Sequence, residues 1–215
     1  MIALDLPRGA RTVLCLGAHC DDLEIGCGGT VLTLSERDPE LRFHWCVFSS
    51  DAERAAEARR AADLFLAAAR HKTVEVLDYR GSYFPWVGAE IKDKFETLKV
   101  EVRPDLILTH YGADLHQDHR VLAELTWNTW RDHFILEYEI PKYDGGLGSP
   151  SVFVPLTADV RDRKIAHVLS CFPSQAARPW FTADTFAGLM RLRGVECNAP
   201  EGSAEAFYCR KLCLR

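Results

Sequence analysis

Short apolar runs rich in β-branched residues alternate with amphipathic segments along most of the chain. The runs typical of strands cover residues 12–18, 42–50, 73–79, 105–110 and 151–156. The segments between them are expected to be helices. The clearest helix covers residues 51–70, where an apolar stripe (Ala56, Ala61, Leu64, Ala68) faces away from a polar side (Arg54, Glu57, Arg59, Arg60). This alternation predicts a Rossmann-like α/β fold, a mostly parallel sheet with helices on both faces.

The last third of the chain departs from this alternation. A loop rich in Gly and Pro covers residues 141–150, and the tail 204–215 alternates enough to predict a final, antiparallel strand at the edge of the sheet. No internal repeat, low-complexity tract or linker separates the segments. Because 47% of the 215 residues are hydrophobic, the core is large enough for independent folding. We expect one domain spanning residues 1–215.

Composition excludes several classes of protein. The formal net charge is -5 and no block of Lys and Arg is present, which argues against nucleic acid or an anionic membrane surface as a partner. No apolar run is long enough for a signal peptide or a membrane span, so we expect a cytoplasmic protein. Eight cysteines occur without a CxxC pair, mostly in apolar surroundings, which favours free buried thiols over disulfides, a zinc finger or a thioredoxin-like site.

Two clusters of polar residues follow predicted strands, where ligands of open parallel sheets gather. HCDDLEIGCGGT (19–30) follows the first strand, and HYGADLHQDHR (110–120) follows the fourth. Zinc catalysis needs about three nitrogen or carboxylate ligands and a nearby base, and these clusters supply both. If a helix begins near Leu115, His116 and His119 share one of its faces. Helix capping would explain each residue alone, but it does not predict two such clusters at neighbouring strand ends.

The glycines of the first cluster also permit a phosphate-binding or dinucleotide-binding loop. Gly26, Gly28 and Gly29 do not keep the GxGxxG spacing, and no Walker lysine follows them. Three acidic side chains would also repel a pyrophosphate there. We therefore expect the glycines to pack the first helix closely against the sheet.

HCDDLEIGCGGT and HQDHRVLAELT together resemble the two signatures of the PIG-L (LmbE-like) zinc-dependent N-deacetylases. FSSDAERAAEARRAADLF resembles the family's serine-containing strand end and Arg-x-x-Glu helix, and RGVECNAPEGSAEAFY resembles its closing segment. The resemblance implies a Rossmann-like fold and a metal-dependent hydrolase that converts the acetamide of an N-acetylated amino sugar, or of its conjugate, to free amine and acetate. It also implies a small-molecule partner and a homo-oligomer.

The resemblance implies a role for each matching residue. His19, Asp22 and His119 would hold one Zn²⁺, although two histidines and a carboxylate also accept other divalent transition metals. Asp21 would be the general base. His116 would stabilise the oxyanion as an imidazolium held by Asp118.

The first motif departs from a common family form at two places. Cys20 stands where proline is common, and Leu23-Glu24 stands where glutamate directly follows the aspartates. We expect Cys20 to pack rather than to bind metal, and we leave Glu24 out of the core site.

Substrate contacts are expected from Arg54 of the Arg-x-x-Glu pattern and from Tyr143 and Asp144 of the glycine-rich loop, which has the length of a lid. Trp86 is more typical of packing than of sugar stacking. Two alternatives stay open: a non-catalytic sugar-binding or metal-binding protein with this fold, and a nucleotide-dependent Rossmann enzyme.

Overall fold

The computed structural model describes residues 9 and 11–213. Its strands are β1 (Thr12–Gly17), β2 (Arg42–Val47), β3 (His71–Val76), β4 (Leu106–His110), β5 (Phe134–Tyr138), β6 (Val152–Leu156) and β7 (Ser203–Tyr208). Its α-helices are α1 (Asp22–Arg37), α2 (Ala52–Phe65), α3 (Gly88–Glu101), α4 (Gln117–Thr129), α5 (Ala158–Cys171) and α6 (Ala183–Glu196). Two 3₁₀ turns, η1 (Phe84–Trp86) and η2 (Pro173–Gln175), precede α3 and follow α5.

The strands form one seven-stranded sheet in the order β3-β2-β1-β4-β5-β7-β6. The pairs from β3 to β5 are parallel, and β7 is antiparallel to both of its neighbours. The predicted α/β class with a mostly parallel sheet is confirmed. The tail does form an antiparallel strand, but the expected edge position is wrong, because β7 lies between β5 and β6 and leaves β6 at the edge. The sequence reasoning also did not identify β5.

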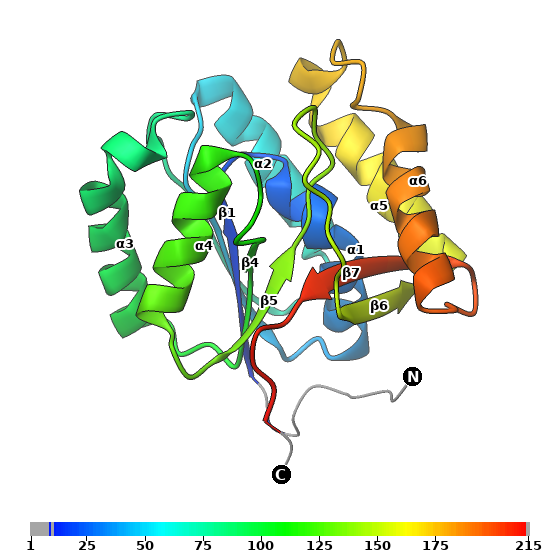
Figure 1. The fold of residues 1–215 in the computed structure, drawn as a ribbon, viewed down its shortest axis with the longest axis horizontal. Helices are drawn as coiled ribbons and strands as arrows, with labels where there is room; N and C mark the ends of the chain where they lie inside the picture. The colour runs from blue at the N-terminus through cyan, green and yellow to red at the C-terminus, as the bar shows by residue number, and fades with distance from the viewer. Residues whose placement is uncertain (1–8, 10, 214–215) are drawn as a thin grey trace.

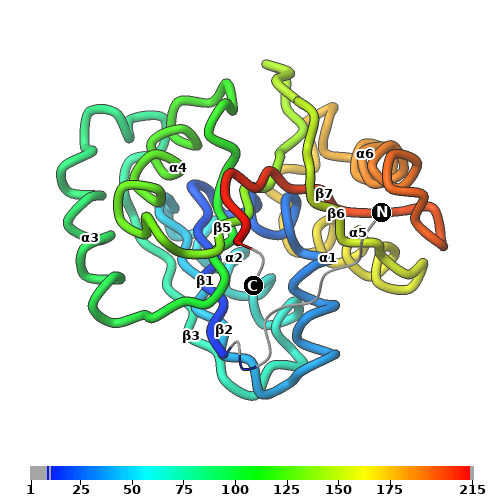
Figure 2. Tube along the Cα trace, turned by 60° about the horizontal axis from the view of Figure 1, so that its bottom comes forward, coloured from blue at the N-terminus to red at the C-terminus, as the bar shows by residue number. Residues whose placement is uncertain are grey.

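Helices cover both faces of the sheet (Figure 1). Along β1, Val13 and Cys15 belong to the core shared with α1, α2 and α5, whereas Leu14 and Leu16 belong to the core shared with α3 and α4. Figure 2 shows α3 and α4 on one side of the strands and α1, α5 and α6 on the other. Successive side chains of β1 therefore enter the cores on opposite faces of the sheet, which explains why the sequence of β1 is a continuous apolar run.

Helix α1 is almost entirely buried, because it lies between the sheet and the helices α2 and α5. Its glycines make this possible. A Cβ on Gly28 would lie 2.5 Å from the Phe65 ring, and one on Gly29 would lie 2.6 Å from Leu156 Cδ1. Close packing against the sheet is confirmed for Gly29, which faces β6, and for Gly26, which faces Tyr138 of β5, whereas Gly28 packs against α2 instead.

Helix α2 buries a different face from the predicted stripe. Its buried residues are Glu57, Ala58, Ala61, Ala62 and Phe65, while Ala56 and Leu64 are exposed. Of the expected stripe, Ala61 is buried as predicted, but the prediction is wrong for the exposed Ala56 and Leu64, and the predicted polar residue Glu57 belongs to the inner face.

All eight cysteines are free, as expected, and six are buried. The predicted burial is wrong for two of them, because Cys209 is half-buried and Cys213 is exposed. None of the helices in the described part of the chain has the length and apolar character needed to cross a bilayer.

Candidate functional site

A cleft of about 720 Å³ lies at the carboxyl ends of β1 and β4 and is lined by residues from both sequence motifs. These two strands are neighbours in the sheet, but the chain reaches β4 only after building β2 and β3 on the other side of β1. This reversal of strand order is the place where open α/β sheets bind ligands.

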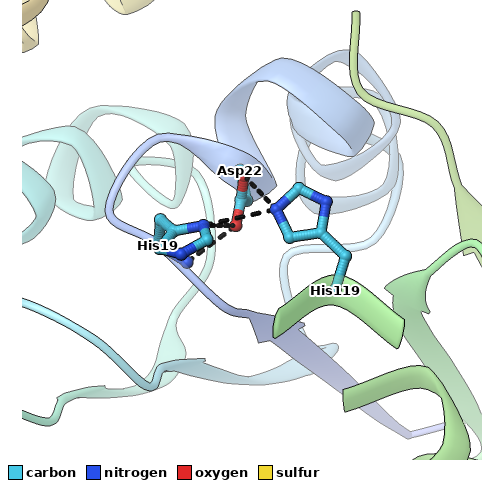
Figure 3. A group of neighbouring side chains, drawn as sticks. All are labelled: His19, Asp22 and His119. Carbon is cyan, nitrogen blue, oxygen red and sulfur yellow. Dashed lines mark hydrogen bonds and ion pairs between the residues drawn. The ribbon is translucent and has the colours of Figure 1, made fainter. Parts of the chain in front are cut away.

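Three residues expected to bind metal lie together in this cleft (Figure 3). Nδ1 of His19 lies 3.2 Å from Asp22 Oδ2 and 3.2 Å from His119 Nε2. His119 Nε2 lies 3.4 Å from the other oxygen of Asp22. One donor atom from each residue thus falls within 4.8 Å of the others, and the group could hold a metal ion.

The local chain direction explains how these residues meet. His19 lies in the turn between β1 and α1, and Asp22 is the first residue of α1. The backbone N–H of His19 donates to Asp22 Oδ2 at 2.7 Å, which fixes the carboxylate beside the ring. His119 lies in the first turn of α4, directly across from them.

Each imidazole of the cluster has a carboxylate on its other nitrogen. Asp118 Oδ2 lies 3.1 Å from His19 Nε2, and Asp114 Oδ2 lies 3.1 Å from His119 Nδ1. Asp118 is fully buried and Asp114 is 2% exposed. Such outer carboxylates fix the ring orientation and the tautomer of metal-binding histidines. The expectation that Asp118 holds His116 is wrong, because the Asp118 carboxylate instead contacts His19.

Carboxylates and imidazoles of the cluster shift the pKa values of one another. Burial alone lowers the pKa of His19, but Asp22 and Asp118 outweigh it and raise the pKa to about 10. Burial raises the pKa of Asp22, yet its histidine neighbours, His119 first, hold that pKa well below its usual range. The cluster therefore carries protons that a metal ion would have to displace.

His116 is the N-cap of α4, which begins at Gln117, two residues after Leu115. Its Nδ1 accepts the backbone N–H of Asp118 at 3.2 Å, which leaves the proton on Nε2. Burial and the neighbouring His119 lower the pKa of His116, so the ring is neutral near pH 7. The expected common face with His119 is confirmed, since the two rings stack with centroids 4.6 Å apart.

Asp21 lines the same cleft and forms an ion pair with Arg54. The Arg54 Nη2 atom lies 3.1 Å from Asp21 Oδ2. Burial raises the pKa of Asp21, and Arg54 opposes this shift. Arg54 also donates to Glu57 Oε2 at 3.0 Å and to Ser174 Oγ at 2.9 Å, so the buried Glu57 holds it in place.

Tyr143 and Asp144 line the cleft from the loop between β5 and β6. Tyr143 is 71% exposed, so its ring is available to a ligand. Trp86 is also 71% exposed, contrary to the packing expected for it, but it is outside the set of residues that line the cleft.

Cys20 is buried and donates through its thiol to the Ser49 carbonyl at 3.3 Å. The two groups of described residues that could hold a metal ion are His19, Asp22 and His119, and His19, His116 and Asp118, and Cys20 is in neither. Glu24 is also fully buried, and neither carboxylate oxygen has a hydrogen-bond partner among the described residues. Burial raises the pKa of Glu24 well above its usual range.

Three further residues contribute to this site without having been assigned a role from the sequence. Asp114 and His110 both belong to the second polar cluster, HYGADLHQDHR, but neither was assigned a role. His110 ends β4, stacks on His119 with centroids 3.9 Å apart, and accepts the Ala18 N–H at 2.9 Å. Lys142 donates to Asp114 from the loop after β5, and no sequence signal connects the two residues.

A family model described as PIG-L, GlcNAc-PI de-N-acetylase, matches residues 14–130, which is more than half of the chain. The chain belongs to the PIG-L family. The matched segment runs from β1 through α4, and it contains both motifs that line the cleft. No match exists among the curated protein sequences.

Solved structures share the fold over nearly the whole chain of this PIG-L member. The conserved protein TT1542 from Thermus thermophilus has a TM-score of 0.74 and 17% identity, with 94% of this chain and 96% of that one covered. N,N'-diacetylchitobiose deacetylase from Pyrococcus horikoshii has a TM-score of 0.72 and 21% identity, covering 96% and 87%. The 4-carboxy-2-hydroxymuconate hydratase from Pseudomonas putida KT2440 has a TM-score of 0.72 and 17% identity, covering 95% and 98%. At these identities the likeness shows the fold, which deacetylases and a hydratase share.

Proposed function

We propose that this protein is a zinc-dependent N-deacetylase that hydrolyses the acetamide of an N-acetylated amino sugar. The observation that carries the proposal is the meeting of two imidazoles and one carboxylate, His19, His119 and Asp22, beside a further carboxylate and imidazole in one cleft. Membership of the PIG-L family supports the same reaction.

The donor set fits a catalytic zinc ion. Catalytic sites commonly use three nitrogen or carboxylate ligands and leave a position open. His19, Asp22 and His119 supply three such donors, and Asp118 and Asp114 back the two imidazoles. A metal bound there would supply Lewis-acid polarisation of the acetyl carbonyl and a lower pKa for water.

Asp21 is assigned as the general base. It takes a proton from the water that attacks the acetyl carbon, and it returns this proton to the amino-sugar nitrogen when the C–N bond breaks and acetate leaves. Its ion pair with Arg54 supports this role, because the guanidinium favours the charged carboxylate that accepts the proton.

His116 is assigned to the developing oxyanion. Its Nδ1 is occupied by the helix N–H, so Nε2–H is the hydrogen that can point to substrate. A neutral, preoriented donor stabilises an oxyanion without any proton transfer. We therefore assign His116 as a neutral hydrogen-bond donor and not as the imidazolium expected from the sequence.

The substrate class is proposed from the cleft and from the relatives. Arg54, Tyr143 and Asp144 line the cleft and offer hydrogen bonds and one exposed aromatic ring, the groups that bind sugar hydroxyls and sugar faces. The Pyrococcus horikoshii relative is named as a deacetylase of N,N'-diacetylchitobiose. We therefore assign a GlcNAc-type conjugate as the substrate and these three residues as its contacts.

Acetate release from a panel of N-acetylated compounds tests the proposal. The panel contains N-acetylglucosamine, N,N'-diacetylchitobiose and a phosphorylated N-acetylglucosamine, with an N-acetylated amino acid as a non-sugar control. Chelator-sensitive release from a sugar but not from the amino acid is expected. Metal binding without release from any sugar would favour the non-catalytic binding protein instead.

A further inference from the structure

Lys142 connects the loop between β5 and β6 to a carboxylate beneath the metal-binding cluster. Its Nζ atom donates to Asp114 Oδ2 at 2.6 Å and to the Ile140 carbonyl at 2.8 Å. The side chains of Lys142 and Asp114 are 12% and 2% exposed. This ion pair is largely shielded from water, so its loss costs more than the loss of a surface pair.

Asp114, the partner of Lys142, also contacts two residues of the site. The oxygen that accepts from Lys142 also lies 3.1 Å from Nδ1 of His119. The other oxygen accepts the backbone N–H of His116 at 2.7 Å. Nε2 of His119, on the far side of the ring, is the atom that faces Asp22 and His19. The carboxylate therefore lies at ion-pair distance from the ring nitrogen of His119 that is opposite the one facing the cluster, although no hydrogen bond joins them among the described residues.

The loop beyond Lys142 has little else to hold it near the site. Its backbone turns through Gly145 and Gly146, both with positive φ, and residues 143–149 are exposed. Gly148 N–H donates to the Tyr208 hydroxyl at 2.8 Å and its carbonyl accepts from Arg193 Nη2 at 3.2 Å, and both contacts lie at the distal end of the loop. Tyr143 and Asp144, which line the cleft, follow Lys142 directly.

We propose that Lys142 is a positioning residue that couples the β5–β6 loop to the metal ligand His119 through Asp114. The inference rests on the proposed metal site. Because the coupling acts through binding free energies, it is reciprocal: the metal ion orders the loop, and the anchored loop strengthens metal binding.

Metal affinity tests the coupling directly. Zinc affinity is measured by competition with a chromogenic chelator for the wild type, Lys142→Met, Lys142→Arg and Asp114→Asn. Loss of a residue that orients a metal ligand typically weakens metal binding by about 10–100-fold, so Asp114→Asn should fall in this range and Lys142→Met near its lower end. Lys142→Arg should restore most of the affinity, since it keeps the cation.

Lys94→Met is the matched control. It removes a lysine of similar exposure, 16%, from an ion pair with Glu75 between α3 and β3, away from the cleft. It should leave zinc affinity unchanged. The visible spectrum of the Co²⁺-loaded protein should also change in Lys142→Met but not in Lys94→Met, because the spectrum reports ligand geometry at the metal.

Hydrogen exchange of the loop tests the reciprocal effect. Zinc should slow amide exchange over residues 142–149 in the wild type and should have little effect there in Lys142→Met. Equal zinc affinity, Co²⁺ spectrum and loop exchange in the wild type and Lys142→Met would overturn the inference while leaving the metal site intact. Failure of the wild type to bind any divalent metal would instead overturn the proposed function.

Discussion

The Asp118 carboxylate lies 3.1 Å from Nε2 of His19, and not against the His116 ring that the sequence had suggested as its partner. Asp118 is held there by the backbone N–H groups of Ser82, at 2.5 Å, and Phe84, at 3.2 Å. Ser82 adopts a φ of 65°, a conformation unusual for a residue other than glycine. The loop after β3 thus orients a carboxylate, the carboxylate orients His19, and Nδ1 of His19 faces Asp22.

Replacing Asp118 by Asn should weaken zinc binding by about 10–100-fold, because His19 loses the acceptor that fixes its ring. Chelator competition measures the affinity, and circular dichroism checks that the fold is retained. Unchanged zinc affinity in a folded variant would show that the contact with His19 does not position a metal ligand.

Replacing Asp21 by Asn should leave metal content intact and lower turnover by about 10²–10⁴-fold, the usual contribution of a positioned acid–base group. Metal content is measured by mass spectrometry and turnover by acetate release. Asn keeps the size of the side chain and its place beside Arg54 but removes the proton acceptor. Turnover equal to that of the wild type on an accepted substrate would contradict the assignment of Asp21 as the base.

Replacing Gly28 by Ala should destabilise the fold by about 1–3 kcal/mol, because the added methyl group overlaps the Phe65 ring. Gly188→Ala is the matched control in α6, where a Cβ would meet no atom within 4 Å. It should be neutral or stabilise by up to about 1 kcal/mol, since Ala favours a helix interior. Urea unfolding measures both variants, and equal effects would argue against tight packing of α1.

The ion pair of Glu75 with Lys94 and His44 should make stability depend on pH. Partial burial raises the pKa of Glu75, but hydrogen bonds from Lys94 and His44 outweigh it and lower the pKa. A lowered folded-state pKa stabilises the protein above the unfolded value, about 4.3, and this contribution is lost as the pH falls through the folded-state pKa.

Glu75→Gln should therefore cost up to about 1 kcal/mol at pH 7, a small value because the group is partly solvated. The difference from the wild type should shrink below about pH 4, as Glu75 becomes protonated in the unfolded and then in the folded protein. Thermal unfolding across pH measures this difference. A constant difference at all pH values would rule out the charge of Glu75 as its source.

The sequence predicts the frame of the fold well, because buried parallel strands are apolar on both faces. Runs such as residues 12–18 and 42–50 therefore contain the observed β1 and β2. β5 was not predicted because it is five residues long and contains a charged residue, Glu137. The carboxylate of Glu137 is buried and accepts hydrogen bonds from Trp127 Nε1 and from the Gly112 N–H. The position of β7 depends on long-range pairing with β5 and β6, which no local pattern records.

The candidate site could be predicted as far as residue type and strand end determine it. Strand order brings His19, Asp22 and His119 together, and the two motifs identify them. Partner choice among several carboxylates depends on side-chain direction, so Asp114 and Asp118 could not be assigned in advance. The burial of Glu57 could not be predicted for the same reason. Its carboxylate lies on the inner face of α2, where it accepts hydrogen bonds from Arg54 and from the Ser174 backbone N–H.

Titration of the metal-free protein with zinc, followed by acetate release from an accepted amino sugar, tests whether this site is a zinc-dependent deacetylase. We expect no release without metal, a rate that rises until one zinc ion per chain has been added, and no such rise in His119→Ala. Acetate release that persists in the metal-free protein, or that is unaffected by His119→Ala, would contradict this assignment.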